Sequence, residues 1–212
     1  MLSARLQRRL WRHHLPLAAA TLASGWLLYA TRDYSDVVTK LSFASAWPAL
    51  VLLAVTLIIG PVRILAGKGP VLSVDLRRDV GIWAGLAGIF HAVIGQCVHL
   101  RGRPWLYYIY EKWQVMPLRY DVFGLSNETG LIAALILAAL LATSNDYYLR
   151  RLGVTRWKSL QQWNYAGFAL AVAHSFGYLI GIEALKPAFI AVATACFIAA
   201  LVLQSLAWRR KT

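Results

Sequence analysis

The chain has 212 residues, of which 59% are hydrophobic and only 15% are charged. Soluble globular proteins carry about 25% charged residues, so this composition excludes an ordinary soluble domain. The high hydrophobicity also excludes intrinsic disorder. A net charge of +13 is typical of proteins that bind nucleic acid, but that interpretation depends on where the basic residues lie.

Six stretches of the chain contain no Asp, Glu, Lys or Arg, and all 31 charged residues lie outside them. The stretches are residues 13–31, 41–62, 80–100, 129–145, 159–182 and 187–208. Each has the length of roughly 17–25 residues with which an apolar helix crosses a bilayer. None alternates with the period of two that is typical of a barrel strand. We therefore predict an all-α integral membrane protein, a bundle of six transmembrane helices that forms a single domain over residues 1–212.

The first stretch, with basic residues before it, also resembles a signal peptide. It lacks a clear cleavage site of small residues, and its apolar sequence continues through Trp26 to Tyr29. We therefore expect a helix that is retained in the protein.

An even number of spans places both termini on one side of the membrane. That side would hold 15 of the 22 basic residues, and the positive-inside rule then makes it the cytoplasmic side of the inner membrane. The basic excess is explained by topology and by attraction to anionic lipid, so we expect no nucleic-acid partner. The 15 residues are Arg5, Arg8, Arg9, Arg12, Arg63, Lys68, Arg77, Arg78, Arg150, Arg151, Arg156, Lys158, Arg209, Arg210 and Lys211.

The longest connection, residues 101–128, lies on the opposite side and is rich in aromatic residues. Tyr and Trp prefer the headgroup level, so this loop is expected to lie along the outer membrane surface. Capping a site or docking a partner are the alternatives. Its Tyr and Trp residues are Trp105, Tyr107, Tyr108, Tyr110, Trp113 and Tyr120.

The cysteines and a search for nucleotide-binding motifs say little about the function. Cys97 and Cys196 lie far apart inside predicted helices, without a CxxC pair, so we interpret them as small apolar fillers. The sequence contains no phosphate-binding loop and no dinucleotide fingerprint. If NAD(P)H is the source of electrons, another protein must deliver them.

The five histidines fall into two groups. His13, His14 and His99 lie near predicted membrane boundaries, where histidine needs no special explanation. His91 and His174 instead lie nine or ten residues inside two parallel helices, roughly 13–15 Å below the outer boundary. Ionisable residues at such depth are candidate functional residues. Two imidazoles at one depth on two helices are suited to axial ligation of a haem iron.

Small residues surround both histidines at one-face helical spacing. They leave room for a flat cofactor, and they would equally allow two bare helices to pack closely. The set comprises Gly81, Gly85, Gly88 and Gly95 around His91, and Gly167, Ala171 and Gly181 around His174.

Three stretches resemble the ferric reductase-like transmembrane domain superfamily, and most closely its MsrQ/YedZ type, the haem-binding subunit of periplasmic methionine sulfoxide reductase systems. They are LLAVTLIIGPVRILAG, LRRDVGIWAGLAGIFHAVIG and LATSNDYYLRRLGVTRWKSLQQWNYAGFALAVAHSFGYL. The similarity covers roughly residues 45–185. The order and spacing of these motifs carry the resemblance, because each motif alone is weak.

The resemblance implies a six-helix haem b protein in which His91 and His174 occupy the ligand positions. The family has a further histidine 13 residues before the second ligand, where this chain has Gln161, so we expect one haem. His99 is retained as a candidate ligand of a second site. Basic residues at helix ends are candidate partners of haem propionates, although topology and lipid contact explain them equally well: Arg77, Arg78, Arg101 and Arg103.

The leading hypothesis is therefore an electron-transfer subunit that serves a periplasmic oxidoreductase, by resemblance a methionine sulfoxide reductase. The sequence contains no fused FAD/NAD(P)H domain, so the donor is expected to be a cytoplasmic flavin reductase or a membrane quinol, with FMN or quinone as a further cofactor. One alternative is a stand-alone ferric or cupric reductase or a quinol-oxidising cytochrome b. Another is a cofactor-free transporter or assembly factor.

Overall fold

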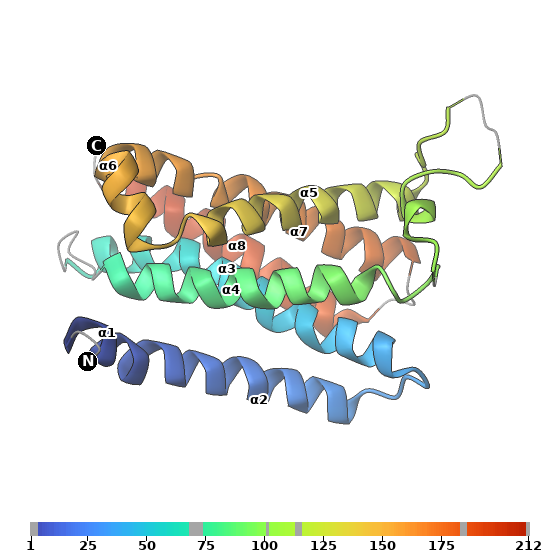
Figure 1. Ribbon diagram of the computed structural model, residues 1–212, viewed down its shortest axis with the longest axis horizontal. Helices are drawn as coiled ribbons and strands as arrows, with labels where there is room; N and C mark the ends of the chain where they lie inside the picture. Colours follow the sequence, from blue (N-terminus) through green and yellow to red (C-terminus); the bar gives the residue numbers. More distant parts are fainter. Residues whose placement is uncertain (1–3, 68–73, 101, 113–115, 183–185, 211–212) are drawn as a thin grey trace.

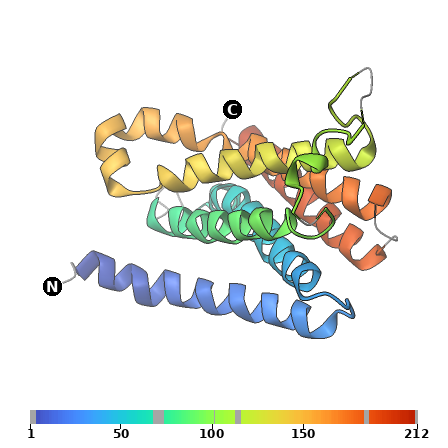
Figure 2. The ribbon, with the colours of Figure 1, turned by 45° about the vertical axis from the view of Figure 1, so that its right-hand side comes forward.

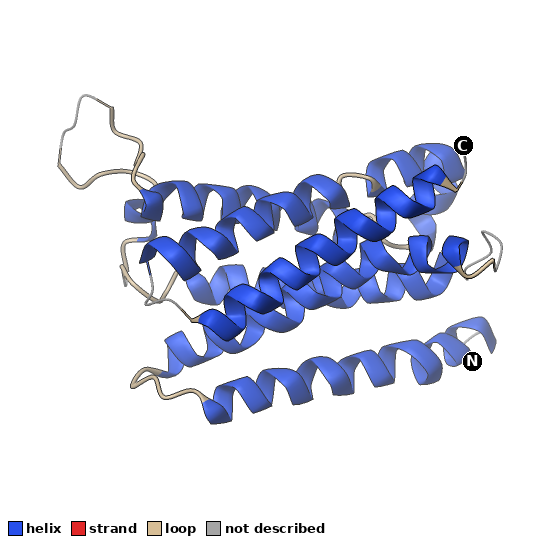
Figure 3. Cartoon of the chain, turned by 180° about the vertical axis from the view of Figure 1, so that it is seen from behind, coloured by secondary structure: helices blue, strands red, loops and turns tan. Residues whose placement is uncertain are grey.

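The computed structural model of the chain describes residues 4–67, 74–100, 102–112, 116–182 and 186–210. These residues form helices, joined by loops that contain one isolated β-bridge between Ile109 and Leu118 (Figure 3). The elements are α1 (Ala4–Arg9), η1 (Leu10–His14), α2 (Leu15–Thr31), α3 (Val37–Leu65), α4 (Val74–Gly95), η2 (Pro104–Tyr107), α5 (Val122–Ala142), α6 (Asp146–Gln161), α7 (Asn164–Phe176), η3 (Gly177–Ile182) and α8 (Pro187–Arg209). The predicted all-α class is confirmed.

Within the described residues, four helical segments are long and apolar enough to cross a membrane. They are α3, α5, the continuous segment Asp146–Ile182 and α8. Two further helices correspond to predicted spans without meeting that description. Helix α2 has only 17 residues, and α4 carries four charged residues in its first two turns. The chain is thus a multi-pass membrane protein.

The long helices lie side by side along the longest axis of the molecule (Figure 1). Helix α1, helix α6 and the last turn of α8 gather at one end, which we call the inner end. The connection between α4 and α5 extends from the opposite end, which we call the outer end. The first and last described helical turns thus share one end, as an even number of crossings requires.

Several helix boundaries differ from the predicted spans, and local contacts account for two of the differences. Helix α5 begins at Val122 rather than at residue 129, because the Asp121 side chain caps it by accepting from the Gly124 N–H at 2.7 Å. Helix α4 ends at Gly95 rather than at residue 100, and the Tyr107 hydroxyl donates to the Gly95 carbonyl at 3.0 Å. The polar helix α6, which the sequence analysis did not include as a helix, begins at an Asn145 cap.

Helix α3 lies at the centre of the packing and makes its most extensive contacts with α4 and α8. Its Trp47, Leu50 and Leu57 join buried side chains of α7 and α8 in one apolar core. Helix α2 runs along one edge of the bundle (Figure 2) and buries none of its residues. Leu28 of α2 packs against the apolar core, and the charged inner end adds further contacts to the N-terminal helices.

The two cysteines are free. Cys196 packs against the core, in agreement with its predicted role as an apolar filler. Cys97 is exposed, because α4 has already ended where the prediction placed this residue inside a span.

Candidate functional site

The two deep histidines lie against each other in the outer half of the bundle. His91 belongs to α4 and His174 to α7, and their ring centroids are 6.0 Å apart with an interplanar angle of 66°. The matched depth predicted from the sequence is therefore realised as direct juxtaposition of the two rings.

Both imidazoles hold the same tautomer. The Nδ1–H of His91 donates to the Ser42 carbonyl of α3 at 2.9 Å, and that of His174 donates to the Ser126 carbonyl of α5 at 2.7 Å. A carbonyl oxygen can only accept, so each Nδ1 carries the proton and each Nε2 keeps its lone pair. A backbone acceptor that fixes the tautomer and the ring orientation is the usual support of a metal-bound histidine.

This donor set fits an iron held between two axial imidazoles. Neutral imidazole nitrogens are common ligands of haem iron, and the two ring centroids lie 6.0 Å apart. His91 and His174 would hold a haem iron through Nε2.

The glycines near the histidine pair allow helix α5 to approach α4 and α7 closely. A Cβ at Gly130 of α5 would lie 2.6 Å from Nδ1 of His174, and one at Gly88 would lie 2.9 Å from a Leu137 methyl group. Gly181 meets Val122 of α5 in the same way. The small residues thus bring α5 close to α4 and α7, which is the close-packing alternative left open by the sequence.

Substitution of Gly130 by alanine is expected to displace the His174 ring. The added methyl group would overlap Nδ1, and overpacking of this kind costs about 1–3 kcal/mol. We expect haem occupancy, measured by the pyridine haemochrome assay, to fall at least tenfold. Gly60→Ala is the control, since no atom lies within 4 Å of the Cβ that it adds. Equal occupancy in the two variants would contradict the packing argument.

Aromatic rings continue outward from the pair. The ring centroid of Tyr178 in η3 lies 5.0 Å from that of His174, and the ring centroid of His99 lies 6.1 Å from that of Tyr178. Tyr107 and Phe123 complete this outer aromatic cluster, which we define as His99, Tyr107, Phe123 and Tyr178. The predicted second-site ligand His99 thus has the rings of Tyr107, Phe123 and Tyr178 as neighbours, which is a different environment from that of His91 and His174.

The outer loop folds back onto this cluster. Tyr107 is fully buried, and its hydroxyl accepts from the His99 backbone N–H at 2.8 Å. Trp105 and Tyr120 of the same loop are exposed. The loop thus caps the outer end through Tyr107 while presenting other rings outward, so the expectation that it lies flat on the membrane describes only part of it. Trp113 lies outside the described residues.

The arginines predicted as propionate partners lie at other depths. Arg78 has a side chain that is only 2% exposed, and it contacts Asp146 at 2.5 Å and Asp75 at 3.4 Å. It lies 13 residues before His91 on α4, which is roughly 20 Å along the axis, and Arg77 is one residue further. Arg103 pairs with Glu111 at the outer end. Arg101 lies outside the described residues.

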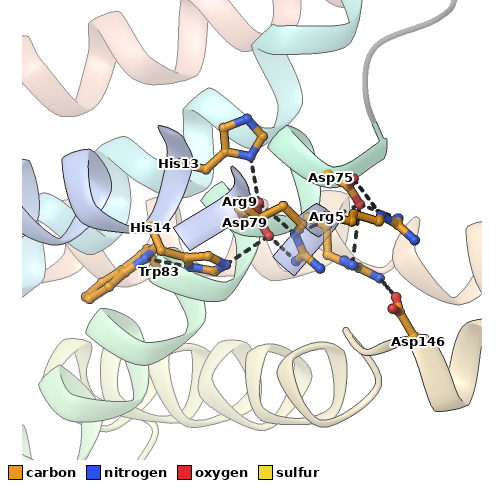
Figure 4. Close-up of polar contacts among 9 residues, drawn as sticks. Arg5, Arg9, His13, His14, Asp75, Asp79, Trp83 and Asp146 are labelled. Carbon is orange, nitrogen blue, oxygen red and sulfur yellow. Dashed lines mark hydrogen bonds and ion pairs between the residues drawn. The ribbon is translucent and has the colours of Figure 1, made fainter. Parts of the chain in front are cut away.

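The inner end holds a charged network that the sequence analysis missed (Figure 4). Its centre is Asp79, a fully buried carboxylate on α4. Asp79 pairs with Arg9 and accepts from His13 Nδ1 at 2.7 Å, and it lies 3.2 Å from His14 Nε2. The Trp83 indole N–H donates to His14 Nδ1 at 3.3 Å. From the sequence, His13 and His14 were expected only to lie near a membrane boundary. The position of Asp79, directly before the predicted span 80–100, was the available signal of a buried ion pair.

The periphery of this network is sensitive to acid. Arg5 donates to Asp75 at 2.7 and 3.1 Å and lowers the pKa of that carboxyl below its usual value. The contact therefore stabilises docking of α1 above the unfolded-state pKa near 4 and is lost as the pH falls through the lower folded-state pKa. Because Arg5 is largely exposed, we expect an effect below about 1 kcal/mol. In wild type, the rate-corrected hydrogen exchange of residues 4–9 should become faster as the pH falls below about 4. An Arg5→Gln variant should lack this pH dependence.

Gln161 occupies the position at which the family pattern has a further histidine. Its amide Nε2 lies 3.4 Å from the Thr143 hydroxyl at the junction of α5 and α6. In the part of the chain that the structure describes, His91 and His174 are the one pair of facing imidazoles within the bundle.

Comparison with known proteins supports the motifs described above. Residues 45–172, more than half of the chain, match the family model of the ferric reductase like transmembrane component. Over 148 residues the chain is 34% identical to the protein-methionine-sulfoxide reductase heme-binding subunit MsrQ of Bordetella pertussis. The match covers 69% of this chain and 65% of that relative, slightly less than two thirds of the relative's length. No solved structure matches the chain. The resemblance predicted from the motifs is confirmed.

Proposed function

Because the chain belongs to the family of ferric reductase-like transmembrane components, we propose that it is a haem b electron-transfer subunit of the cell inner membrane. The observation that carries this proposal is the His91–His174 pair, with both Nε2 atoms available and both rings fixed by backbone carbonyls. Such a subunit passes electrons from a donor to a partner protein.

Within this proposal, the chain's own residues have distinct tasks. Haem, when bound, supplies a centre that gains and loses one electron. His91 and His174 hold it and set its orientation, while the apolar core around α3 keeps water away from it. A single site follows from Gln161, since an amide is not a normal haem ligand.

We further propose six membrane crossings, with α2 and α4 as the additional spans and with cytoplasmic termini. The positions of α1 and of the end of α8 at one end of the bundle support this arrangement (Figure 1). The basic residues assigned to the inner end support the orientation under the positive-inside rule.

The electron path would then run from the inner to the outer end. A cytoplasmic flavin reductase with FMN, or a membrane quinol, is the proposed donor. The outer aromatic cluster fills the space between His174 and the outer loop, which makes that loop the proposed place of transfer to a periplasmic acceptor. The name of the Bordetella relative suggests a methionine sulfoxide reductase as this acceptor.

The experiment that tests this function is a redox difference spectrum of protein purified from haem-replete cells. We expect a Soret band that shifts on reduction by dithionite, and one haem per chain. A colourless protein would overturn the proposal, and two haems per chain would overturn the single-site assignment.

A second candidate, a stand-alone metal reductase, is favoured by the description of the family itself. The exposed rings of the outer loop would then shape the site of a ferric or cupric complex. Reduction of such complexes by the isolated protein with quinol as donor, without any periplasmic protein, would favour this candidate over the first.

A further inference from the structure

A small cavity lies at the inner end, away from the histidine pair. It has a volume of about 190 Å³ and is bounded by α3, α4, α7 and α8. The polar side chains that line it are Arg77, Tyr165, Gln204 and Trp208. Arg77 lies 14 residues before His91 on α4, so this cavity and the proposed haem site lie at different depths.

The cavity exists because α3 contains Gly60 and Pro61 in its last turns. Proline has no N–H, so the carbonyl of Leu57 lacks its helical partner. The Gln204 side chain of α8 replaces that partner by donating to the Leu57 oxygen at 2.8 Å. A Cβ at Gly60 would meet no atom within 4 Å. The missing side chain of Gly60 leaves a space next to Pro61, and the Gln204 amide borders it.

The lining of the cavity is rich in hydrogen-bond donors. It combines a guanidinium group, an indole N–H, a phenolic hydroxyl and the second amide N–H of Gln204, and it contains no carboxylate. Arg77 has no carboxylate partner among the described residues, whereas its neighbour Arg78 has two. A fixed cation beside several neutral donors suits an anion with several acceptor oxygens, such as a phosphate ester.

The location identifies the source of that phosphate. Trp208 is 70% exposed, and Tyr165 is also exposed, as expected for rings at the level of lipid headgroups. Three further basic residues lie at the ends of α3 and α8: Arg63, Arg209 and Arg210. Basic pockets between transmembrane helices attract anionic headgroups. We propose that this cavity binds the phosphate of an anionic phospholipid, with Arg77 as its principal ligand.

The test uses the full chain, delipidated in neutral detergent and titrated with short-chain phosphatidylglycerol. Binding is measured by native mass spectrometry and by the shift in unfolding temperature. We expect saturable binding of one lipid that Arg77→Gln weakens at least tenfold. Arg150→Gln is the matched control, because Arg150 is an exposed arginine of the same end. Tyr165→Phe, which keeps the ring and removes one donor, should weaken binding about threefold and keeps the test valid if Arg77→Gln fails to fold.

Two further titrations identify the source of the phosphate. Phosphatidylcholine should bind much more weakly than phosphatidylglycerol, and inorganic phosphate should not compete at equal concentration. Equal protection by inorganic phosphate would assign the cavity to a free anion and overturn the lipid assignment. Equal binding of both lipids, or wild-type binding by both Arg77→Gln and Tyr165→Phe, would also overturn the proposal. None of these measurements depends on haem.

Discussion

Alanine in place of either His91 or His174 is expected to abolish haem binding, with loss of the Soret band and of the haem found by the pyridine haemochrome assay. The two Nε2 atoms are the proposed axial ligands, and each ring is already oriented by its Nδ1–H bond to Ser42 or Ser126. Removal of one imidazole leaves only one imidazole of the pair to hold the iron. We therefore expect less than a tenth of the wild-type haem content.

His99→Ala is the matched control for this experiment. It removes an imidazole of the same outer half, but one whose ring neighbours are Tyr107, Phe123 and Tyr178. Haem content should stay near the wild-type level. Retention of the Soret band in both His91→Ala and His174→Ala would contradict the assignment, whereas loss of haem in His99→Ala alone would move the site into the outer aromatic cluster.

Asp79→Ala is expected to destabilise the protein by about 3 kcal/mol or more. The buried carboxylate of Asp79 contacts the side chains of Arg9, His13 and His14. Its removal leaves the partly buried Arg9 guanidinium and two imidazole rings without this acceptor, and breaking a buried ion pair costs about 3–5 kcal/mol. Since α2 buries none of its own residues, the N-terminal helices should detach first.

Two measurements check this prediction. The free energy of unfolding in mixed detergent micelles should fall by the stated amount, and limited proteolysis should cut the chain within α1 and η1. Asp33→Ala is the control, because Asp33 is an exposed carboxylate of the α2–α3 connection, and it should change stability by less than about 0.5 kcal/mol. A loss as small as that of the control would show that the network does not hold α1 and α2 to the bundle.

The sequence determined the class of the protein because lipid imposes a strong local rule. A helix that crosses a bilayer must be about 20 residues long and nearly free of charge, and this rule can be read without any knowledge of packing. The same rule made His91 and His174 conspicuous, and equal distances from the charged helix ends predicted their equal depth. Helix ends were less accurate, because caps such as Asp121 and the Tyr107 contact at Gly95 depend on single hydrogen bonds.

Only the tertiary structure decided which distant residues meet. The Asp79–His13 contact joins residues 66 positions apart, and the carbonyls that orient the histidine pair come from helices other than their own. The glycine stripes illustrate the same point, since room for a cofactor and close approach of a helix require the same residues, and only the structure shows that α5 packs against several of them. Charge and hydropathy report where a segment lies relative to the membrane, whereas pairing depends on how the helices rotate and pack, which no local pattern contains.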